Sequence, residues 1–340
     1  MRRLLCLVLV VVGLTGCAKH LPPSMHPAES VIYETADGWR NEIRHYPGTR
    51  GPVLRVHGLG ANHYNFDFRA EVSLAHYLQR AGYDVWIPEL RGDPGAQAPS
   101  RDAAWNFDFD DIARGDVPRV VDTVRERTGA PSVLWVGHSM GGMLLYTVLS
   151  TTPEKVGAGV VVGSPAVLDT HSVLHRAAKH AGFLLHGRRP MPAERLARLA
   201  SPLGRFNPMF PMLANPRQLD GPTAVGLARV ALTDLTRPMA REAIRWIQEG
   251  KITDDRGGSW VRPAAVPILA LGGSVDRIVP PANVAAACAI HPRCAFRELG
   301  AKTGFTGDYG HIDTLLGKNA ASEVYPMIET FLDGYAQPLP

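Results

Sequence analysis

The feature that most constrains the fold is the pentapeptide Gly-His-Ser-Met-Gly at residues 137–141, together with the sequence on either side of it. Residues 132–136 form a short apolar run that predicts a buried strand, and residues 140–151 form an apolar run long enough for a helix. A chain that passes from strand to helix this quickly must turn sharply, and the flanking glycines leave room for the turn. The sequence therefore predicts that Ser139 lies at a strained turn, at the edge of a sheet and at the N-terminus of a helix.

Strand and helix patterns alternate on both sides of this turn. The sequence predicts strands over residues 31–34, 42–46, 52–57, 83–87, 132–136, 156–162, 267–271 and 295–299. It predicts helices over residues 69–81, 110–128, 140–151 and 313–332. The first two strands are expected to form an antiparallel hairpin. Strands that alternate with helices indicate an α/β fold, with a mostly parallel central sheet flanked by helices.

The alternation stops between residues 165 and 263, where helical stretches and prolines take over. We expect this segment to be a helical cap or lid over the carboxyl edge of the sheet. Residues 30–164 and 264–340 are then expected to form the core. Apolar side chains of the cap either line a pocket for an acyl chain or pack the cap onto the core. The candidates for such a pocket are Phe206, Met209, Phe210, Met212 and Leu213.

The first 16 residues are typical of an export signal. Arg2 and Arg3 precede the apolar stretch 4–14, which is too short to span a bilayer. Small residues then precede Cys17, a pattern that resembles the lipobox of bacterial lipoproteins. Cleavage at this point would leave Cys17 as a lipidated N-terminus, because its thiol accepts the diacylglyceryl group. The alternative is an ordinary signal peptide with a chance cysteine.

Lipidation at Cys17 would determine where the protein resides. Each buried CH₂ contributes about 0.8 kcal/mol, so two or three acyl chains would hold the protein firmly to a membrane. Residues 17–29 contain several prolines and would act as a tether. Ala18 after the cysteine favours sorting to the outer membrane. We therefore expect an exported bacterial lipoprotein at the periplasmic or surface face of that membrane.

The composition argues against several classes of protein. With 45% hydrophobic and 20% charged residues, the chain can bury enough apolar surface to fold, which argues against disorder. No apolar run approaches the roughly 20 residues of a membrane-spanning helix. Arg2 and Arg3 supply two of the four net positive charges, so little charge remains to support nucleic-acid binding. We predict no protein partner.

The remaining positive charge is unevenly distributed. Between residues 171 and 205, seven Lys and Arg residues accompany a single acid, Glu194. This basic segment either contacts anionic lipid headgroups or is a solvated charged face.

Two cysteines, Cys288 and Cys294, lie outside the N-terminal segment. In an oxidising compartment they can form a disulfide that closes a short loop, and the alternative is a pair of free buried thiols. Neither C-x-x-C nor H-E-x-x-H occurs in the sequence, so no metal site is expected. We expect no cofactor.

A serine nucleophile needs backbone N–H groups that stabilise the oxyanion formed during attack. One donor is expected from Met140, the residue after Ser139. The other is expected from Leu59, which follows the predicted strand 52–57 and lies between two glycines that allow close approach of substrate. His57 in the same loop is expected to have a structural role rather than to act as a base.

The acid and the base are expected downstream of the serine. Asp276 follows the predicted strand 267–271, and His311 follows the last predicted strand, so both lie at the carboxyl edge of the sheet. His311 would accept the proton of Ser139, and Asp276 would orient and stabilise the imidazole. Asp169 is a rival for the acid. Asp308 and Asp313 are interpreted as a loop carboxylate and a helix-start residue.

Several further motifs carry a resemblance to a known family. They are His57-Gly58-Leu59, Ser73-Leu74-Ala75, Ala81-Gly82-Tyr83-Asp84-Val85-Trp86, Arg91-Gly92, Trp105-Asn106-Phe107-Asp108-Phe109-Asp110, Asp116-Val117-Pro118, Thr128-Gly129 and Tyr309-Gly310-His311-Ile312-Asp313. With them, residues 52–150 and 265–333 resemble the α/β-hydrolase superfamily, and specifically the acid-lipase branch of its lipases and esterases. Met140 stands where acid lipases usually carry Gln. The resemblance implies hydrolysis of a small-molecule or lipid ester through an acyl-enzyme on Ser139.

Two alternatives share these sequence features. An acyltransferase would use the same three side chains and pass the acyl group to an acceptor other than water. A membrane-anchored binding protein could use the fold without catalysis. Dehalogenases and epoxide hydrolases of this fold need an aspartate in place of Ser139, which disfavours both.

Overall fold

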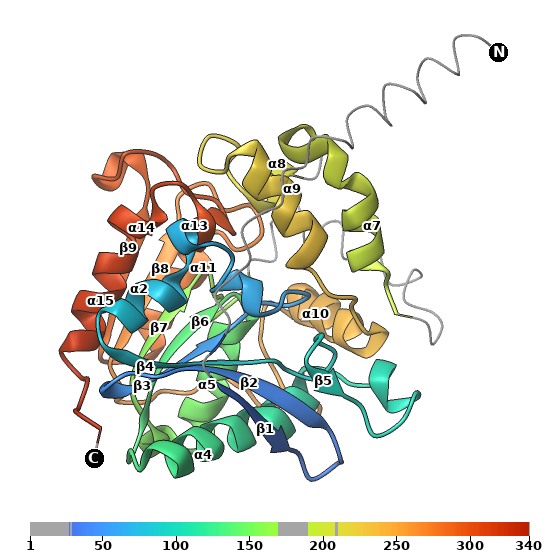
Figure 1. The fold of residues 1–340 in the computed structure, drawn as a ribbon, viewed down its shortest axis with the longest axis vertical. Helices are drawn as coiled ribbons and strands as arrows, with labels where there is room; N and C mark the ends of the chain where they lie inside the picture. Colours follow the sequence, from blue (N-terminus) through green and yellow to red (C-terminus); the bar gives the residue numbers. More distant parts are fainter. Residues whose placement is uncertain (1–26, 28, 169–189, 208–209, 340) are drawn as a thin grey trace.

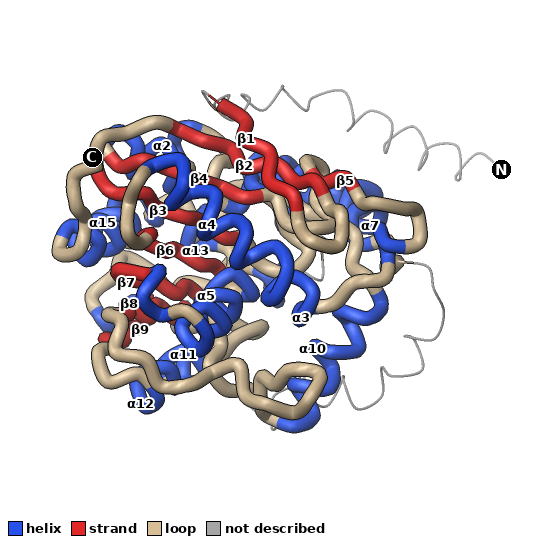
Figure 2. The backbone as a smooth tube through the Cα atoms, turned by 90° about the horizontal axis from the view of Figure 1, so that it is seen from below, coloured by secondary structure: helices blue, strands red, loops and turns tan. Residues whose placement is uncertain are grey.

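The computed structural model describes residue 27 and residues 29–168, 190–207 and 210–339. At its centre lies a mixed sheet with the strand order β1-β2-β4-β3-β6-β7-β8-β9, and β5 pairs with β2. Figure 2 shows the strands following one another from β1 to β9 in this order. Their bounds are β1 Glu29–Glu34, β2 Arg40–Tyr46, β3 Arg50–Val56, β4 Tyr83–Pro88, β5 Ala96–Gln97, β6 Val133–His138, β7 Val156–Val162, β8 Ile268–Gly273 and β9 Cys294–Leu299.

Strand pairing follows the sequence prediction. β1 and β2 form the expected antiparallel hairpin, and β2 also pairs antiparallel with β4. From β4 through β3, β6, β7 and β8 to β9, every neighbouring pair is parallel. The predicted α/β fold with a mostly parallel sheet is confirmed.

Helices, most of them short, connect the strands and cover the sheet (Figure 1). The α-helices are α2 Leu74–Arg80, α3 Phe109–Asp111, α4 Val117–Thr128, α5 Met140–Thr151, α7 Ala193–Ala200, α8 Phe210–Leu213, α9 Gly221–Val230, α10 Arg237–Glu249, α11 Pro281–Ala285, α12 Ala287–Ile290, α13 Asp313–Leu316, α14 Ala320–Glu323 and α15 Tyr325–Asp333. Short 3₁₀-helices are η2 His63–Asn65, η3 Ala70–Val72, η4 Ala103–Trp105, η6 Pro153–Lys155, η8 Ser201–Phe206 and η9 Ala301–Thr303.

The sheet is buried on both faces. On β3, Val53 and Leu54 point to opposite sides because successive side chains of a strand alternate. Val53 packs in one apolar core with Leu78 of α2 and Ile328 of α15. Leu54 belongs to a second core that includes Leu144 of α5. Burial on both faces explains why these strands are apolar runs rather than alternating patterns.

Three predicted helices are less continuous than expected. The segment predicted over 110–128 contains a π-helical turn, η5 Ile112–Asp116, because Pro118 has no N–H to donate to the preceding turn. The segment predicted over 313–332 divides into α13, α14 and α15. Gly317 breaks it with an extended backbone, at ψ 153°, and a Cβ there would lie 2.5 Å from the Asp313 carbonyl oxygen. In the segment predicted over 69–81, Ala70–Val72 is a 3₁₀-helix, and the α-helix begins only at Leu74, after Ser73, whose Oγ accepts the His76 N–H.

The helices α7, α8, α9 and α10 lie between β7 and β8 in the chain and gather beside the sheet as a cap (Figure 1). All four fall inside the segment predicted as an insertion. The base of the cap is hydrogen-bonded to the core. Thr236 Oγ1 donates to the Phe107 carbonyl at 2.6 Å, and Glu242 accepts the Phe109 N–H at 2.8 Å. Trp260 Nε1, after α10, donates to Asp110 at 2.7 Å.

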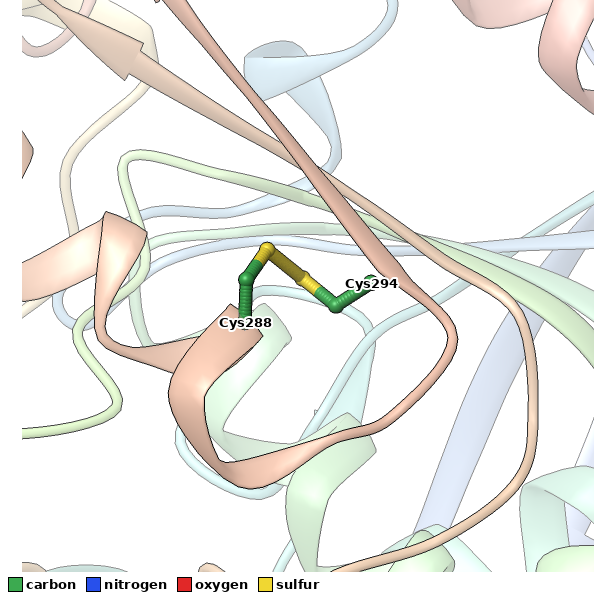
Figure 3. The surroundings of a disulfide bond; sticks show 2 residues. All are labelled: Cys288 and Cys294. Carbon is green, nitrogen blue, oxygen red and sulfur yellow. A yellow bond between two sulfur atoms is a disulfide. The ribbon is translucent and has the colours of Figure 1, made fainter.

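Cys288 of α12 and Cys294 of β9 are joined by a disulfide, with 4.7 Å between their Cα atoms (Figure 3). The bond closes the turn between the helix and the strand.

No helix among the described residues combines the length and the apolar character needed to cross a bilayer. The predicted signal at residues 1–16 and the lipidation at Cys17 lie outside the described residues.

Candidate active site

Ser139 occupies a strained turn between β6 and α5. Its backbone has φ 53° and ψ −118°, and it is the only non-glycine residue with positive φ in the described part of the chain. Such a conformation is unfavourable for a residue with a side chain, so the surrounding structure must enforce it. The Ser139 N–H donates to the Val162 carbonyl oxygen at 2.9 Å, which ties the turn to the end of β7.

The two glycines of the pentapeptide are required by close backbone contacts. A Cβ added to Gly137 would lie 2.3 Å from the Gly141 carbonyl oxygen. A Cβ added to Gly141 would lie 1.9 Å from the Val56 carbonyl oxygen at the end of β3. Both distances are far below van der Waals contact, so any larger residue would push β3, β6 and α5 apart. The turn at Ser139 therefore depends on β3 as well as on its own strand and helix.

His311 and Asp276 meet beside the carboxyl ends of β8 and β9. His311 Nδ1 lies 2.7 Å from Asp276 Oδ2, and both side chains are buried. The other Asp276 oxygen accepts the N–H groups of Ile278 and Val279, each at 2.8 Å. The carboxylate is thus held by its own loop. With Nδ1 occupied by Asp276, the free ring nitrogen of His311 can take a proton from a hydroxyl.

Backbone proximity brings this pair next to the serine turn. A Cβ on Gly163, just after β7, would lie 3.2 Å from His311 Nδ1 and 3.5 Å from Asp276 Oδ2. Ser139 and His311 line the same cavity. The structure therefore places together the three side chains that the sequence predicts. The rival acid Asp169 lies outside the described residues.

The loop after β3 lies against Ser139. A Cβ on Gly58 would lie 3.0 Å from the Ser139 Cβ. Leu59 in this loop lines the cavity beside Ser139. Among the hydrogen bonds of the described residues, neither the Leu59 N–H nor the Met140 N–H is donated to a protein acceptor. Both predicted oxyanion donors are therefore available for a ligand oxygen.

Asn65 and His138 connect this loop to His311. Asn65 Oδ1 accepts the Gly58 N–H at 3.3 Å and lies 2.9 Å from His138 Nδ1. His138 Nε2 lies 3.1 Å from the His311 carbonyl oxygen. Burial, and then the charge on His311, lower the pKa of His138 to about 3, so its ring is neutral. A neutral imidazole has one N–H, so His138 donates to one of these two oxygens at a time. No local sequence pattern singles out either residue for this role.

His57 is buried beneath the same loop, as a structural residue should be. Its Nε2 lies 2.7 Å from Asp93 Oδ2. Burial alone would lower the pKa of His57, but the charge of Asp93 and the hydrogen bond to it raise it to about 9. Burial raises the pKa of Asp93 to about 6, against the opposing effect of His57. The two groups form a buried pair in which the Asp93 carboxylate favours the protonated form of His57.

The group formed by His57, Glu89 and Asp93 is the one candidate for metal ligation that the described residues contain. Two contacts within and beside the group are already made, whereas Glu89 Oε2 is buried without a hydrogen-bond partner among the described residues. His57 pairs with Asp93, and Glu89 accepts a short hydrogen bond from His63. This cluster thus acts as a support for the loop that carries Leu59.

Two further carboxylates hold the loops of the site. Asp313 is fully buried and accepts the Gly310 and Asn215 N–H groups, each at 2.8 Å. Burial raises the pKa of Asp313 to about 6. Asp308 accepts a hydrogen bond from Ser274 at 2.9 Å, close in sequence to Asp276. These contacts fix the backbone on either side of His311.

The cavity beside Ser139 has a volume of about 330 Å³. The core contributes the polar residues Asn65, His138, Ser139 and His311. The cap contributes mainly small and apolar side chains to its wall, together with Ser201 and Asn207. Alanines recur along α7 and α9, at spacings that place them on one helix face. The cap residues of this wall include Ala197, Ala200, Ala224, Leu227, Ala228, Ala231 and Leu232.

The predicted pocket residues are only partly in this wall. Phe210 and Leu213 line the cavity, and Met212 does not. Phe206 lies on the outer surface, where its side chain is 79% exposed. The chain kinks two residues earlier at Gly204, which has φ 49°. Met209 lies outside the described residues.

The comparison with known families assigns the fold. Residues 51–317 match the family described as alpha/beta hydrolase fold. The chain belongs to this family, and the fold class that the sequence predicts is confirmed.

Similar proteins include lipases and esterases. The chain is 33% identical to the gastric triacylglycerol lipase of Bos taurus over 178 residues, covering 47% of this chain and 45% of that protein. It is 33% identical to the lysosomal acid lipase/cholesteryl ester hydrolase of Homo sapiens over 143 residues, covering 38% of this chain and 36% of that protein. The match thus spans less than half the length of these relatives, and it confirms the resemblance to acid lipases that the motifs carry.

The solved structure of an esterase from Thermogutta terrifontis is also similar. It gives a TM-score of 0.60 at 18% identity and covers 91% of this chain and 99% of that chain. At this level of identity the likeness concerns the fold alone.

Proposed function

We propose that the protein is a serine hydrolase that cleaves carboxylic esters through an acyl-enzyme, with Ser139, His311 and Asp276 as its catalytic residues. The observation that carries the proposal is the convergence of these groups. A strained serine and a histidine that is paired with a buried carboxylate line one cavity, and two backbone N–H groups are available beside the serine. The similarity to triacylglycerol and cholesteryl ester lipases supports an ester as substrate.

The reaction follows from these positions. Ser139 Oγ attacks the ester carbonyl carbon while His311 Nε2 takes the hydroxyl proton. The carbonyl oxygen becomes an oxyanion and accepts hydrogen bonds from the Leu59 and Met140 N–H groups. Asp276 stabilises the imidazolium. His311 then gives the proton to the leaving alcohol, the C–O bond of the ester breaks, and the acyl group stays on Ser139. Water, deprotonated by His311, releases the acid by the same steps.

The cavity indicates the kind of ester. Its cap wall is mostly apolar, with Ser201 and Asn207 as the polar residues that the cap contributes. An acyl chain can lie against such a wall, with its carbonyl group beside Ser139. We therefore propose an ester with an apolar acyl group, from a small molecule or a lipid.

The first experiment combines a serine-directed phosphonate with Ser139→Ala. The parent protein is expected to be labelled and to hydrolyse a panel of esters of increasing acyl length. Ser139→Ala is expected to retain its thermal unfolding temperature, to escape labelling and to lose activity by a factor of about 10⁴ or more. Turnover retained by Ser139→Ala would refute the nucleophile. Analysis of products distinguishes release of free acid from transfer to an alcohol or amine acceptor.

We also propose that the protein is an exported lipoprotein anchored to the outer membrane through Cys17. The lipobox-like sequence before Cys17 supports this location. In the native host, Cys17→Ser is expected to move the protein from the membrane fraction to the soluble fraction, because the acyl chains supply the anchoring free energy. Unchanged fractionation of Cys17→Ser would refute the anchor.

A further inference from the structure

Three buried side chains with metal-binding atoms meet beyond the carboxyl ends of β3 and β4. His57 follows β3 directly, and Glu89 and Asp93 follow β4. The two strands are parallel neighbours, so their carboxyl ends lie at the same edge of the sheet. One possible ligand atom from each of the three side chains lies within 4.8 Å of the other two. We call these three residues the loop cluster.

The His57 ring is oriented with Nε2 toward the loop cluster. Its Nδ1 donates to the Gly58 carbonyl oxygen at 3.0 Å, and its Nε2 lies 2.7 Å from Asp93 Oδ2. The Leu90 N–H donates to the same Asp93 oxygen at 2.7 Å. Metal-binding histidines typically donate the second ring N–H to a backbone carbonyl in this way, which leaves the other nitrogen for the ion. Either a proton on Nε2 or a cation can therefore link the ring to the carboxylate.

Glu89 supplies an oxygen for which the described residues offer no partner. Its Oε1 accepts a short hydrogen bond from His63, whereas its Oε2 is buried and has no hydrogen-bond partner among the described residues. The whole side chain is only 1% exposed. A buried charged oxygen without a partner is costly in free energy, so such an atom marks a place for a ligand. A cation bound by the loop cluster would be that ligand.

A small cavity gives an ion access to the loop cluster. It has a volume of about 30 Å³, and His57 and Asp93 line it together with Leu59 and Met140. That volume suits a single ion or water molecule rather than a substrate. Leu59 also lines the larger cavity that holds Ser139, so the small cavity adjoins the loop with the proposed oxyanion donor.

Two guanidinium groups lie near the loop cluster, and each has carboxylates of its own. Arg91 donates to Asp116 and to Asp37. Arg44, whose charge acts on the cluster, lies 3.8 Å from Glu42. The two carboxylates of the loop cluster therefore leave negative charge that protons on the neighbouring histidines, or a divalent ion, can balance.

We propose that the loop cluster binds one divalent transition-metal ion of the zinc type, through His57 Nε2 and carboxylate oxygens of Glu89 and Asp93. An imidazole nitrogen with two carboxylate oxygens is a ligand set that suits such ions. Ca²⁺ is a poorer fit, because it takes about six to eight oxygen ligands. None of the three side chains lines the cavity that holds Ser139, so the ion is structural. It joins the loop after β3 to the loop after β4 and thereby holds Leu59 in place.

The test measures zinc binding by the full-length protein after metals are removed with EDTA and dialysis. Calorimetric titration with ZnCl₂ should show one site per chain. The unfolding temperature should rise by about 3–5 °C when free zinc exceeds the dissociation constant about 100-fold. Glu89→Gln and Asp93→Asn each remove one charged ligand and should weaken zinc binding by about 100-fold or more. CaCl₂ should produce no comparable rise.

Glu29→Gln is the matched control, because Glu29 is also a carboxylate beside a histidine that contacts a second carboxylate. His45 lies 3.3 Å from Glu29 and 2.7 Å from Asp84, outside the loop cluster. Glu29→Gln should leave the affinity for zinc unchanged, and so should Ser139→Ala. A parent protein that binds zinc at this site but hydrolyses no ester would keep the metal site and lose the proposed function.

X-ray absorption at the zinc edge tests the site without a substitution, which covers the case in which both loop-cluster variants fail to fold. The parent should show nitrogen and oxygen ligands at about 2.0–2.2 Å, with a single imidazole among them. A parent protein without saturable zinc binding overturns the proposal, as does a spectrum with two or more imidazoles. Equal affinity in the parent, Glu89→Gln and Asp93→Asn also overturns it, and so does an equal loss in Glu29→Gln.

Discussion

The carboxyl edge of the sheet, which holds Ser139 and His311 and is here called the catalytic edge, faces the same cavity as the cap. The two regions are nevertheless built differently. In α5, which directly follows Ser139, ten of the twelve residues are buried, whereas α7 of the cap has no buried residue. At the sheet edge, backbone atoms of β3 approach Gly141 so closely that no side chain fits. In the cap, alanines such as Ala228 line the wall, and a Cβ added to Gly221 would meet no atom within 4 Å. Gly141, two residues after Ser139 in the pentapeptide, therefore has no room for a side chain, whereas Gly221 of the cap has room for one.

The largest expected effect comes from replacing one glycine in each region with alanine and comparing the two variants. Gly141→Ala places a Cβ 1.9 Å from the Val56 carbonyl oxygen, so we expect a loss of about 3 kcal/mol or more in the free energy of unfolding. Gly221→Ala, at the start of α9, should stabilise the protein by about 0.5–1 kcal/mol, because it meets no atom and reduces the entropy of the unfolded chain. Urea unfolding followed by tryptophan fluorescence measures both. If the two variants changed the free energy of unfolding by similar amounts, the catalytic edge and the cap would not differ in their tolerance of a side chain.

A second test uses two asparagines that lie in the same loop and face different regions. Asn65 holds the Gly58 N–H and contacts His138, at the catalytic edge. We expect Asn65→Ala to lower kcat by about 10- to 100-fold with little change in KM, because the oxyanion donors of the loop are displaced. Steady-state kinetics on a soluble ester give both constants.

Asn62 is the control for Asn65, because its Nδ2 donates to the Val230 carbonyl at the end of α9 in the cap, at 2.8 Å. Asn62→Ala is expected to change KM for long-chain esters and to leave kcat on short esters near that of the parent. If Asn62→Ala lowers kcat as much as Asn65→Ala does, the effect comes from general loosening of the loop and not from Asn65.

The smallest expected effect concerns pH. Burial raises the pKa of Glu242, at the base of the cap, to about 8. A carboxyl group whose pKa is higher in the folded state than in the unfolded state stabilises the fold at low pH, and this stabilisation is lost as pH rises from about 4.5 through 8. Glu242→Gln should therefore flatten the decline of the unfolding temperature over this range, by a few degrees. Thermal unfolding at pH 5, 6.5 and 8 measures it.

His57 gives the corresponding effect at the catalytic edge. The pKa of His57 is raised to about 9 in the folded protein. Its contribution to the free energy of unfolding is therefore fully present below about pH 6.5 and is lost as the pH rises through 9. Glu242→Gln should leave the decline of the unfolding temperature at alkaline pH unchanged. Asp93→Asn should reduce this decline, because no carboxylate then raises the pKa of His57. If Glu242→Gln also removed the decline of the unfolding temperature above pH 8, the titrations of Glu242 and His57 would be coupled.

The sequence predicted the catalytic edge better than the cap, and the reason is physical. The turn at Ser139 is encoded by a strand, two glycines and a helix that are contiguous in the chain, so a local pattern is sufficient. Asp276 and His311 were predictable as residues that follow strands, since parallel strands bring their carboxyl ends to one edge. Their catalytic roles remain predictions.

The cap was harder to predict because its helices are oriented by tertiary contacts. Phe206 was predicted as a pocket residue because it is large and apolar, but its side chain is 79% exposed, beyond the kink at Gly204. No sequence pattern marks the alanines of α7 and α9 as pocket residues. They form a pocket wall only because both helices lie beside the cavity that holds Ser139. The network of Asn65 and His138 likewise joins residues far apart in the chain.

The disulfide between Cys288 and Cys294 has a consequence for how the last strand is aligned. β9 is an edge strand with β8 as its neighbour in the sheet, and Cys294 is its first residue, opposite Ile268. An edge strand can slip along its neighbour more easily than a central one, and a slip of one residue turns every side chain to the other face. Because α12 holds the partner cysteine and Ala287 of that helix is fully buried, the covalent bond fixes which residue of β9 lies opposite Ile268. His311 follows β9 in the chain, so the disulfide also helps to set the alignment of the strand that precedes this histidine.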